Sequence, residues 1–260
     1  MGLLRSIAAA FSLYSRIPMP SFEWKDEDMR FCMCAFPLVG VIEAVLAVLV
    51  FELLGYFDIG ILFSAAIMTA LPVLYTGGIH MDGLLDTYDA LCSYGDKDKK
   101  LEILKDPHIG GFAVIRTIVY VLIAFGCFGE LTERTVSYGA DTYIIYAVAG
   151  GYIVSRILSA ISVIRFRKAK DEGMVSAISE SNDRKCFAIL IVILITVIAA
   201  GALLLGRYAF VWLAALPVFA YYRYRSYRDF GGITGDLAGW FLQLCELAFL
   251  ITATVFSIFW

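Results

Sequence analysis

Residues 186–206 read CFAILIVILITVIAAGALLLG, a run in which no side chain carries a charge. An apolar run of about 20 residues has the length that an α-helix needs to cross the hydrocarbon core of a bilayer. The rest of the 260-residue chain is similar in character, because 60% of its residues are hydrophobic and only 17% are charged. Soluble domains carry about 25% charged residues. The sequence therefore predicts an all-α, polytopic integral membrane protein and excludes a water-soluble globule.

Further apolar stretches predict additional membrane spans on both sides of this run. They lie at 33–55, 58–76, 110–129, 141–164, 208–222 and 237–258. The segment before the first of them is expected to form a short N-terminal interfacial helix. The whole chain, 1–260, is thus expected to be a single membrane-embedded domain of about seven transmembrane helices, partnered by the lipid bilayer.

Cationic side chains outside the predicted spans give an independent test of that order. In chain order, the eight segments outside the spans, termini included, hold 4, 0, 4, 1, 6, 1, 3 and 0 lysines and arginines, counting Lys25, Arg30 and Lys170 among them. Cytoplasmic segments of multi-span proteins carry the excess of positive charge. The alternation predicts a cell membrane protein with its N-terminus in the cytoplasm and its C-terminus outside. The net charge of −3 excludes nucleic acid as a partner.

Four charged residues fall inside predicted spans: Glu43, Arg116, Arg156 and Glu246. Charges at membrane depth usually face a partner or a wet cavity. Two acids and two arginines are able to pair, but the sequence does not say which residue pairs with which. The six cysteines form no C-x-x-C pair and are expected to be reduced packing residues.

The segment after the second span, GGIHMDGLLDTYDA at 77–90, has the most unusual pattern in the chain. If it is helical, Asp82, Asp86 and Asp89 project from one face within two turns. Adjacent carboxylates repel one another unless a cation neutralises them, and all-oxygen ligands suit Mg²⁺, which commonly holds substrate phosphates. The alternative is a solvated acidic face. His80 would point away from the carboxylates, and it is expected either to be structural or to contact substrate.

Two further segments on the predicted cytoplasmic side add anion-binding groups. Asp106-Pro107 predicts a helix N-cap at the start of the third span, which leaves a chemical role for Asp106 open. GGITGDLAG at 231–239 repeats the Gly-Gly-Ile-x-x-Asp order of 77–82, and it follows Arg223 and Arg225. Glycines let backbone amides approach an anion, although Thr234 and Asp236 would also serve as helix caps. Carboxylates, glycines and arginines together predict metal-dependent phosphoryl transfer.

The motifs GGIHMDGLLDTYDA, LEILKDPHIGGFAV at 101–114 and GGITGDLAG resemble those of the cobalamin synthase family, the adenosylcobinamide-GDP ribazoletransferases. The likeness extends to FSLYSRIPMP at 11–20 and FPLVG at 36–40, so it spans nearly the whole chain. Departures are mild: Leu85 and Ala90 replace the alanine and glycine of many members, and Cys92 stands where some relatives carry histidine.

The resemblance implies a Mg²⁺-dependent reaction in the last steps of cobalamin biosynthesis. In it, α-ribazole or its 5′-phosphate displaces GMP from adenosylcobinamide-GDP and gives adenosylcobalamin or its phosphate. The implied metal ligands are Asp82, Asp86, Asp89 and Asp236. The catalytic candidates are Asp82, Asp86, Asp89, His80 and Asp106, and the candidates for substrate binding are Gly77, Gly78, Lys105, Arg223, Arg225, Gly231, Gly232 and Thr234.

Two other functions are compatible with parts of the sequence. CDP-alcohol phosphotransferases also carry an acidic cluster on a membrane helix, but their usual pattern places Ala-Arg after Asp-Gly, where this chain has Leu84-Leu85. A cation-coupled transporter would use the charges inside the spans and would move its substrate without chemistry. The sequence is compatible with a homo-oligomer and does not decide the oligomeric state.

Overall fold

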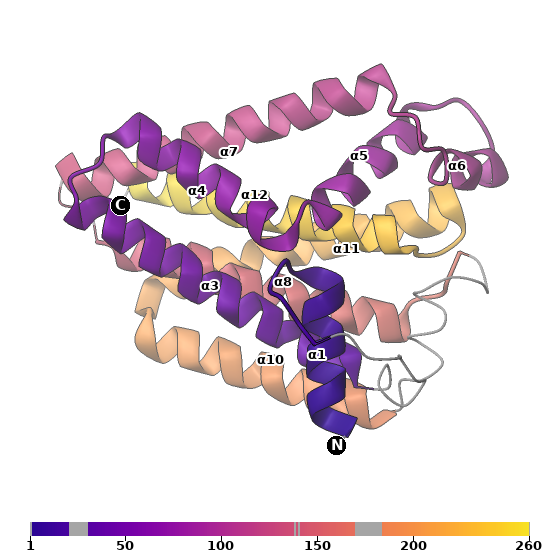
Figure 1. Ribbon diagram of the computed structural model, residues 1–260, viewed down its shortest axis with the longest axis horizontal. Coiled ribbons are helices and arrows are strands. Elements are labelled where there is room, and N and C mark those ends of the chain that lie inside the picture. The colour runs from indigo at the N-terminus through magenta and orange to yellow at the C-terminus, as the bar shows by residue number, and fades with distance from the viewer. Residues whose placement is uncertain (1, 21–30, 138, 140, 170–183, 260) are drawn as a thin grey trace.

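The computed structural model describes residues 2–20, 31–137, 139, 141–169 and 184–259. Within these ranges the chain is helical, and an isolated bridge between Lys168 and Ile233 is the extent of its β-structure. The elements of Figure 1 are α1 (Gly2–Tyr14), α3 (Cys32–Tyr56), α4 (Ile61–Thr76), α5 (Ile79–Cys92), α6 (Lys97–Ile103), α7 (Gly111–Ser137), α8 (Tyr143–Arg165), α10 (Arg184–Leu204), η1 (Gly206–Ala214), α11 (Ala215–Arg225), η2 (Ser226–Phe230) and α12 (Gly235–Phe259). The predicted all-α class is confirmed, and so is a helix at the N-terminus.

The described residues contain five helices long and apolar enough to cross a membrane, namely α3, α7, α8, α10 and α12. A sixth span is counted only if α4 and α5 are taken together, because the chain bends by 93° between them. The expected count of about seven is therefore too high by this measure. The stretch at 208–222 accounts for part of the difference, since it is divided between the 3₁₀-helix η1 and the 11-residue α11, whose end YYRYR is polar.

The bend between α4 and α5 depends on two glycines. Gly77 and Gly78 have φ of 67° and 83°, a left-handed conformation that side chains with a Cβ rarely adopt. Gly77 ends α4 and Gly78 precedes the first residue of α5. The backbone N–H of Arg16 donates to the carbonyl of Tyr75 just before this turn, at 2.8 Å. The turn directs α5 away from the line of α4 and places it beside α12, as Figure 1 shows.

The segments rich in lysine and arginine gather at one end of the helix bundle. There Lys100 of α6 forms an ion pair with Asp229 of η2 at 3.1 Å. The backbone N–H of Ile233 donates to the carbonyl of Arg167 at 2.9 Å, which joins the chain after α8 to the chain before α12. In Figure 1 this is the end that carries α6, and it is called the basic end below.

The segments poor in positive charge gather at the opposite end. Tyr208 donates through its hydroxyl to Asp141 at 3.1 Å, and Arg134 donates to the carbonyl of Ser257 at 3.0 Å. The segments joined by these contacts thus fall into the two groups that the charge alternation predicts, while the orientation of these groups in a membrane stays a prediction. Three cations that it also counted, Lys25, Arg30 and Lys170, lie outside the described residues.

Three of the four charges inside the predicted spans form one compact group. Arg156 of α8 is fully buried and pairs with Glu43 of α3 at 2.7 Å and with Glu246 of α12. Arg116 lies apart from them, with its guanidinium 5.1 Å from the ring centre of Tyr88. One arginine therefore serves both acids and links three helices. The sequence identified these charged residues but did not predict which of them pair.

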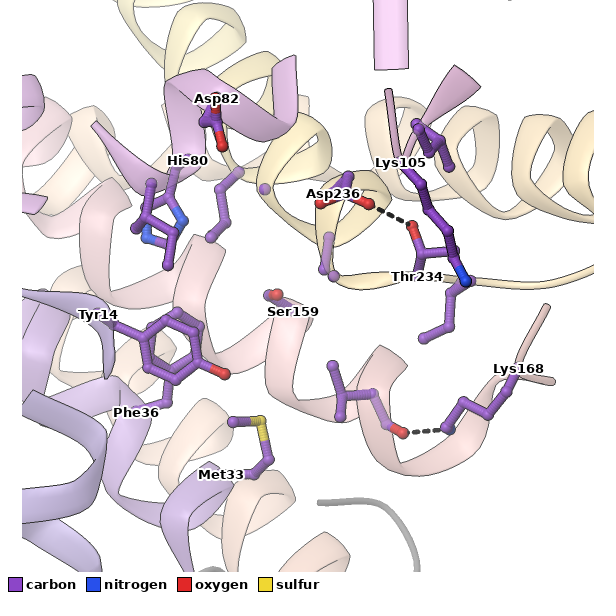
Figure 2. Close-up of a pocket in the computed structure, with 18 of the residues that line it drawn as sticks. Tyr14, Met33, Phe36, His80, Asp82, Lys105, Ser159, Lys168, Thr234 and Asp236 are labelled. Atoms are coloured by element: carbon purple, nitrogen blue, oxygen red, sulfur yellow. Dashed lines mark hydrogen bonds between the residues drawn. The ribbon is translucent and has the colours of Figure 1, made fainter. Parts of the chain in front are cut away.

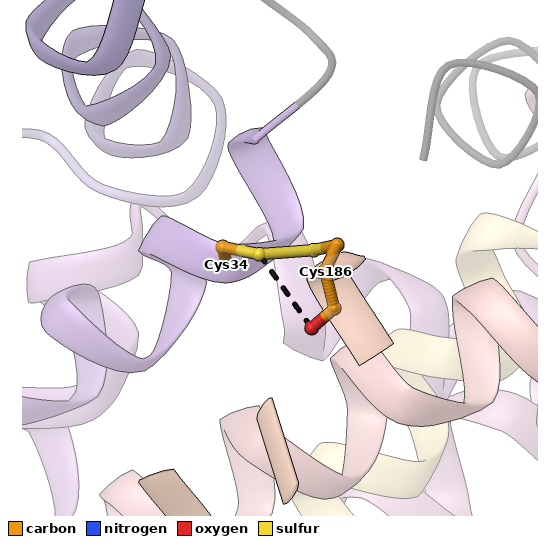
Figure 3. Close-up of a disulfide and its surroundings, with 2 residues drawn as sticks. All are labelled: Cys34 and Cys186. Carbon is orange, nitrogen blue, oxygen red and sulfur yellow. Dashed lines mark hydrogen bonds between the residues drawn. A yellow bond between two sulfur atoms is a disulfide. The ribbon is translucent and has the colours of Figure 1, made fainter. Parts of the chain in front are cut away.

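A disulfide joins the first turns of two helices at the basic end. Cys34 of α3 and Cys186 of α10 are bonded, with their Cα atoms 5.9 Å apart (Figure 3). The expectation that all six cysteines are reduced is therefore wrong for these two, and it holds for the other four. The two cysteines are separated by 152 residues, so no local spacing reveals the pair.

Candidate functional site

The acidic motif forms the helix α5, as the spacing of its carboxylates predicts. Asp82 is exposed at its start, and Asp86 and Asp89 follow on successive turns, half-buried. The pKa of Asp86 is raised to about 7, first by burial and then by the negative charges of Asp82, Asp236 and Asp89. The carboxylate of the second motif thus belongs to the same electrostatic cluster as those of the first.

Glycines bring the two motifs together. A Cβ atom at Gly83 would lie 2.7 Å from the carbonyl oxygen of Asp236, and one at Gly239 would lie 3.3 Å from the Cα of His80. These distances are too short for an ordinary side-chain contact, so α5 and α12 approach each other as closely as their backbones allow. The two motifs that share the Gly-Gly-Ile-x-x-Asp order therefore contact each other in the structure.

Asp89 faces a different neighbour. Its carboxylate lies against Gly110, so closely that a Cβ there would overlap it. Gly110 immediately precedes α7, and a carboxylate at a helix N-terminus is stabilised by the helix dipole. Asp82 and Asp89 are two turns apart, which is about 10 Å along a helix. The described residues accordingly contain no group of three or more His, Cys, Asp or Glu side chains that would hold a metal by themselves.

The donor set nevertheless suits Mg²⁺. This ion usually keeps several waters and binds through one or two carboxylates plus substrate phosphates, so it does not need a cage of protein ligands. Asp82, Asp86 and Asp236 offer oxygen donors only, and their mutual repulsion is expressed in the raised pKa of Asp86. A divalent cation would relieve that repulsion. Asp89 would have to turn away from Gly110 to join them.

A cavity of about 380 Å³ opens beside the acidic cluster (Figure 2). Asp82 and Asp236 lie on one side of it, at the level where α5 and α12 meet. Figure 2 shows Tyr14, Phe36 and Met33 below His80, whereas Lys105 and Lys168 lie on the far side of Asp236. The cavity thus has an aromatic half and a lysine half, with carboxylates between them.

His80 is buried in the aromatic half. It is 3% exposed, and its Nε2 has no hydrogen-bond partner among the described residues. Burial and the charge of Arg156 hold its pKa well below the usual range, so the imidazole is neutral. The predicted position of His80 on the side away from the carboxylates is consistent with this placement.

The two lysines come from different parts of the chain. Lys105 follows α6 and was predicted as a substrate-binding residue. Lys168 follows α8, and its ammonium donates to the carbonyl of Phe166 at 2.9 Å and to that of Val163. Burial lowers the pKa of Lys168. Two cations beside a carboxylate cluster are suited to the oxygens of a phosphorylated substrate.

Asp106 is placed differently from the prediction. The helix that it was expected to cap begins at Gly111, and Asp106 instead accepts hydrogen bonds from the backbone N–H and Nδ1 of His108, at 3.0 and 2.7 Å. These bonds lower the pKa of Asp106. Its carboxyl is exposed and is not part of the cavity wall. Asp106 therefore shapes the loop before α7, where the chain bends at Pro107 and His108.

The two predicted arginines also have other partners. The guanidinium of Arg223 lies 5.4 Å from the ring centre of Phe166 and 5.5 Å from that of Tyr227. Arg225 forms an ion pair with Asp229 at 2.5 Å. Both residues are at the basic end, but the wall of the cavity, as the structure describes it, includes neither.

Local geometry explains the remaining candidates. Thr234 accepts a hydrogen bond from the backbone N–H of Leu237 at 3.2 Å, which is the capping role left open by the sequence, and it also lines the cavity. Gly231 has φ of 81°. A Cβ at Gly232 would overlap the backbone of 168–169. These glycines allow a tight turn and a close crossing of chains.

Several cavity residues were missed by the motif reasoning. They are Tyr14, Met33, Phe36, Ser159 and Lys168. Tyr14 and Phe36 lie within FSLYSRIPMP and FPLVG, two stretches to which the resemblance extended without giving their residues a role. The others lie in apolar helices or in a basic loop, where nothing distinguishes them from packing or topology residues.

Carboxylates, lysines and an apolar cavity at one end of a membrane helix bundle define a membrane-embedded transferase of phosphorylated substrates. Comparison with known proteins identifies the family. The family model described as cobalamin-5-phosphate synthase matches residues 6–254, and this chain belongs to that family. No solved structure matches the chain.

Relatives in three genera match nearly the whole length of the chain. A Lachnoclostridium phytofermentans protein is 41% identical over 95% of this chain and 92% of its own. A Desulfitobacterium hafniense protein is 32% identical over 97% and 98%, and a Clostridium botulinum protein is 30% identical over 98% and 99%. Each is named adenosylcobinamide-GDP ribazoletransferase.

Proposed function

We propose that this chain is a Mg²⁺-dependent transferase that joins α-ribazole, or its 5′-phosphate, to adenosylcobinamide-GDP. The products are adenosylcobalamin, or its phosphate, and GMP. The observation that carries the proposal is the meeting of Asp82 and Asp236 with Lys105 and Lys168 at one cavity, with Asp86 in the same electrostatic cluster, in a chain whose relatives bear this enzyme's name.

The chemistry needs charge neutralisation and a proton acceptor. A ribose hydroxyl of the acceptor attacks the phosphorus nearer the cobinamide, the bond from that phosphorus to the GMP oxygen breaks, and the hydroxyl proton passes to a base. Bound Mg²⁺ would supply positive charge to the diphosphate, with Asp82, Asp86 and Asp236 holding it. Lys105 and Lys168 are placed to bind phosphate oxygens. A carboxylate of the cluster is the better proton acceptor, because the low pKa of buried His80 makes it a weak base.

The orientation follows from the charge distribution. The basic end carries the site, and positively charged segments face the cytoplasm in multi-span proteins. The active site would therefore open to the cytoplasm of a cell membrane, where nucleotide-activated substrates are made.

The decisive experiment is a transfer assay with the purified, detergent-solubilised protein. Incubation with adenosylcobinamide-GDP, α-ribazole and Mg²⁺ is expected to release GMP and form a cobalamin in equal amounts. Chromatography measures both products. EDTA should stop both, and excess Mg²⁺ should restore them. Folded protein that makes neither product would refute the proposed function, and CDP-alcohol substrates would then be tested.

Gly110→Ala is expected to lower kcat about 10- to 100-fold. The added methyl group would overlap the carboxylate of Asp89 and displace it together with the start of α7, and small displacements in a site have effects of this size. The measurement is steady-state GMP release at saturating substrates.

The adjacent Gly111→Ala is the matched control. A Cβ at Gly111 has no atom within 4 Å outside its own helix and chain neighbours, so this variant should keep nearly full activity. Equal losses in the two variants would show that the loop before α7 tolerates no substitution at all and that Asp89 has no particular role.

A further inference from the structure

The aromatic half of the cavity is built from three stacked or tilted rings. The ring centres of Tyr14 and Phe36 are 4.4 Å apart, and each lies 6.2 Å from the imidazole of His80. The proposed reaction brings three bulky groups to the site: the corrin of the donor, the guanine of the donor, and the base of the acceptor. The cavity dimensions and chemistry distinguish among them.

Size excludes the corrin. The whole cavity, including its lysine half, measures about 380 Å³, near the lower end of the range for small-molecule sites. A corrin macrocycle with its amide side chains and adenosyl group is far larger than a two-ring base. The corrin must therefore remain outside, whereas either base would fit.

Polarity favours the acceptor base over guanine. Guanine presents several hydrogen-bond donors and acceptors around its edge, each of which needs a partner when buried. The aromatic half offers few polar groups, chiefly the imidazole of His80 and the hydroxyls of Tyr14 and Ser159. The base of α-ribazole is dimethylbenzimidazole, a flat apolar bicycle with two methyl groups and one free ring nitrogen. An apolar pocket with one imidazole matches that description.

The unpaired Nε2 of His80 supplies the missing partner. A buried polar atom without a hydrogen bond is uncommon in folded proteins, and because His80 is one of the residues that line the cavity, its unpaired Nε2 is a group that a bound ligand would complete. With its proton on Nε2, His80 would donate one hydrogen bond, and the free ring nitrogen of the base accepts one. The ribose would then extend toward Asp82 and Asp236, where the reaction takes place.

We infer that the aromatic half of the cavity is the binding site of the acceptor base, which lies against the rings of Tyr14 and Phe36 and accepts a hydrogen bond from His80. This inference rests on the proposed function and adds which substrate occupies the cavity. It assigns His80 to recognition of the base and not to proton transfer.

The test removes the His80 imidazole and the free ring nitrogen of the base, separately and together, as in a double-mutant cycle. His80→Leu is expected to raise KM for α-ribazole about five- to tenfold, as loss of one buried hydrogen bond predicts, and to leave KM for adenosylcobinamide-GDP unchanged. His80→Gln should recover part of the loss. The riboside of dimethylindole, which has a carbon in place of the free ring nitrogen, should bind wild type more weakly than α-ribazole does and should be insensitive to His80→Leu.

A second variant probes shape without touching His80. Ser159→Leu narrows the cavity and should raise KM for α-ribazole more than KM for the riboside of unmethylated benzimidazole. Thermal unfolding checks that each variant is folded. The inference is overturned if both variants raise KM for the donor and not for the acceptor. It is also overturned if His80→Leu raises KM for α-ribazole and KM for the dimethylindole riboside by the same factor. In either case the proposed function stands. Absence of transfer by the wild type would instead overturn the function itself.

Discussion

Asp86→Asn is expected to lower kcat for ribazole transfer by about 10²- to 10³-fold, the range found when one group that stabilises developing charge is removed. Burial and the negative charges of Asp82, Asp236 and Asp89 raise the pKa of Asp86, and a bound cation would offset that repulsion. The same change should weaken Mg²⁺ binding, which titration of activity against Mg²⁺ concentration will measure.

The same residue should make the stability of the metal-free protein depend on pH. The pKa of Asp86 is about 7 when folded and has an ordinary value of 3.8 when unfolded. Between these values the folded state holds a proton that the unfolded state has released, so stability falls as pH rises from about 4 to about 7. Thermal unfolding with EDTA should show that fall, and Mg²⁺ or Asp86→Asn should reduce it.

A matched exposed carboxylate separates these effects from a general loss of negative charge. Asp98 on α6 is exposed at the same end of the molecule, and Asp98→Asn should change neither kcat nor the pH profile. Asp86→Asn should be at least as stable as wild type without metal above pH 7, because it removes a repelled charge. An inactive variant that is also less stable there would indicate a structural role for Asp86.

Hydrophobic run length predicted the long helices well because the membrane requirement is local. The expected 33–55 is α3 at Cys32–Tyr56, and 237–258 is α12 at Gly235–Phe259. The periodicity of Asp82, Asp86 and Asp89 likewise predicted the helix α5. Each of these inferences needs only neighbours in sequence.

The cavity was not predictable in this way because it is a product of distant packing. Tyr14, Phe36 and Ser159 belong to three different helices and Lys168 to the loop after α8, and each has an ordinary reason to be where it is in the sequence. The direction of Asp89 toward Gly110 depends on how the loop before α7 returns to α5. The 93° bend at Gly77 and Gly78 sets the direction of α5, and a pair of glycines specifies a turn without specifying its angle.

The buried charges bear on the transporter alternative. A translocation site inside the membrane needs groups that are free to bind a cargo ion. Arg156 already contacts Glu43 and Glu246, and its guanidinium also donates to the hydroxyl of Ser155 at 3.0 Å. This group is better explained as a connection among α3, α8 and α12, and that explanation has a measurable consequence.

Arg156→Met is expected to destabilise the protein by about 3–5 kcal/mol, because it leaves two buried carboxylates without a counter-charge. Glu43 is fully buried and Glu246 is 7% exposed, so neither can be solvated in place. Gly40 lets α3 and α8 pack closely beside this group, since a Cβ there would lie 2.7 Å from the carbonyl of Tyr152. Thermal unfolding and the yield of monodisperse protein in detergent measure the effect.

Glu43→Gln is the matched control and should cost about 1 kcal/mol or less. It removes one charge from a group of two carboxylates and one guanidinium, and the remaining Arg156–Glu246 pair is neutral. Combining Arg156→Met with Glu43→Gln and Glu246→Gln should restore much of the stability that Arg156→Met loses, since no unpaired charge is left buried. Similar losses in Arg156→Met and Glu43→Gln would contradict this account, because they would mean that the geometry of the contacts, and not the balance of buried charge, holds the three helices together.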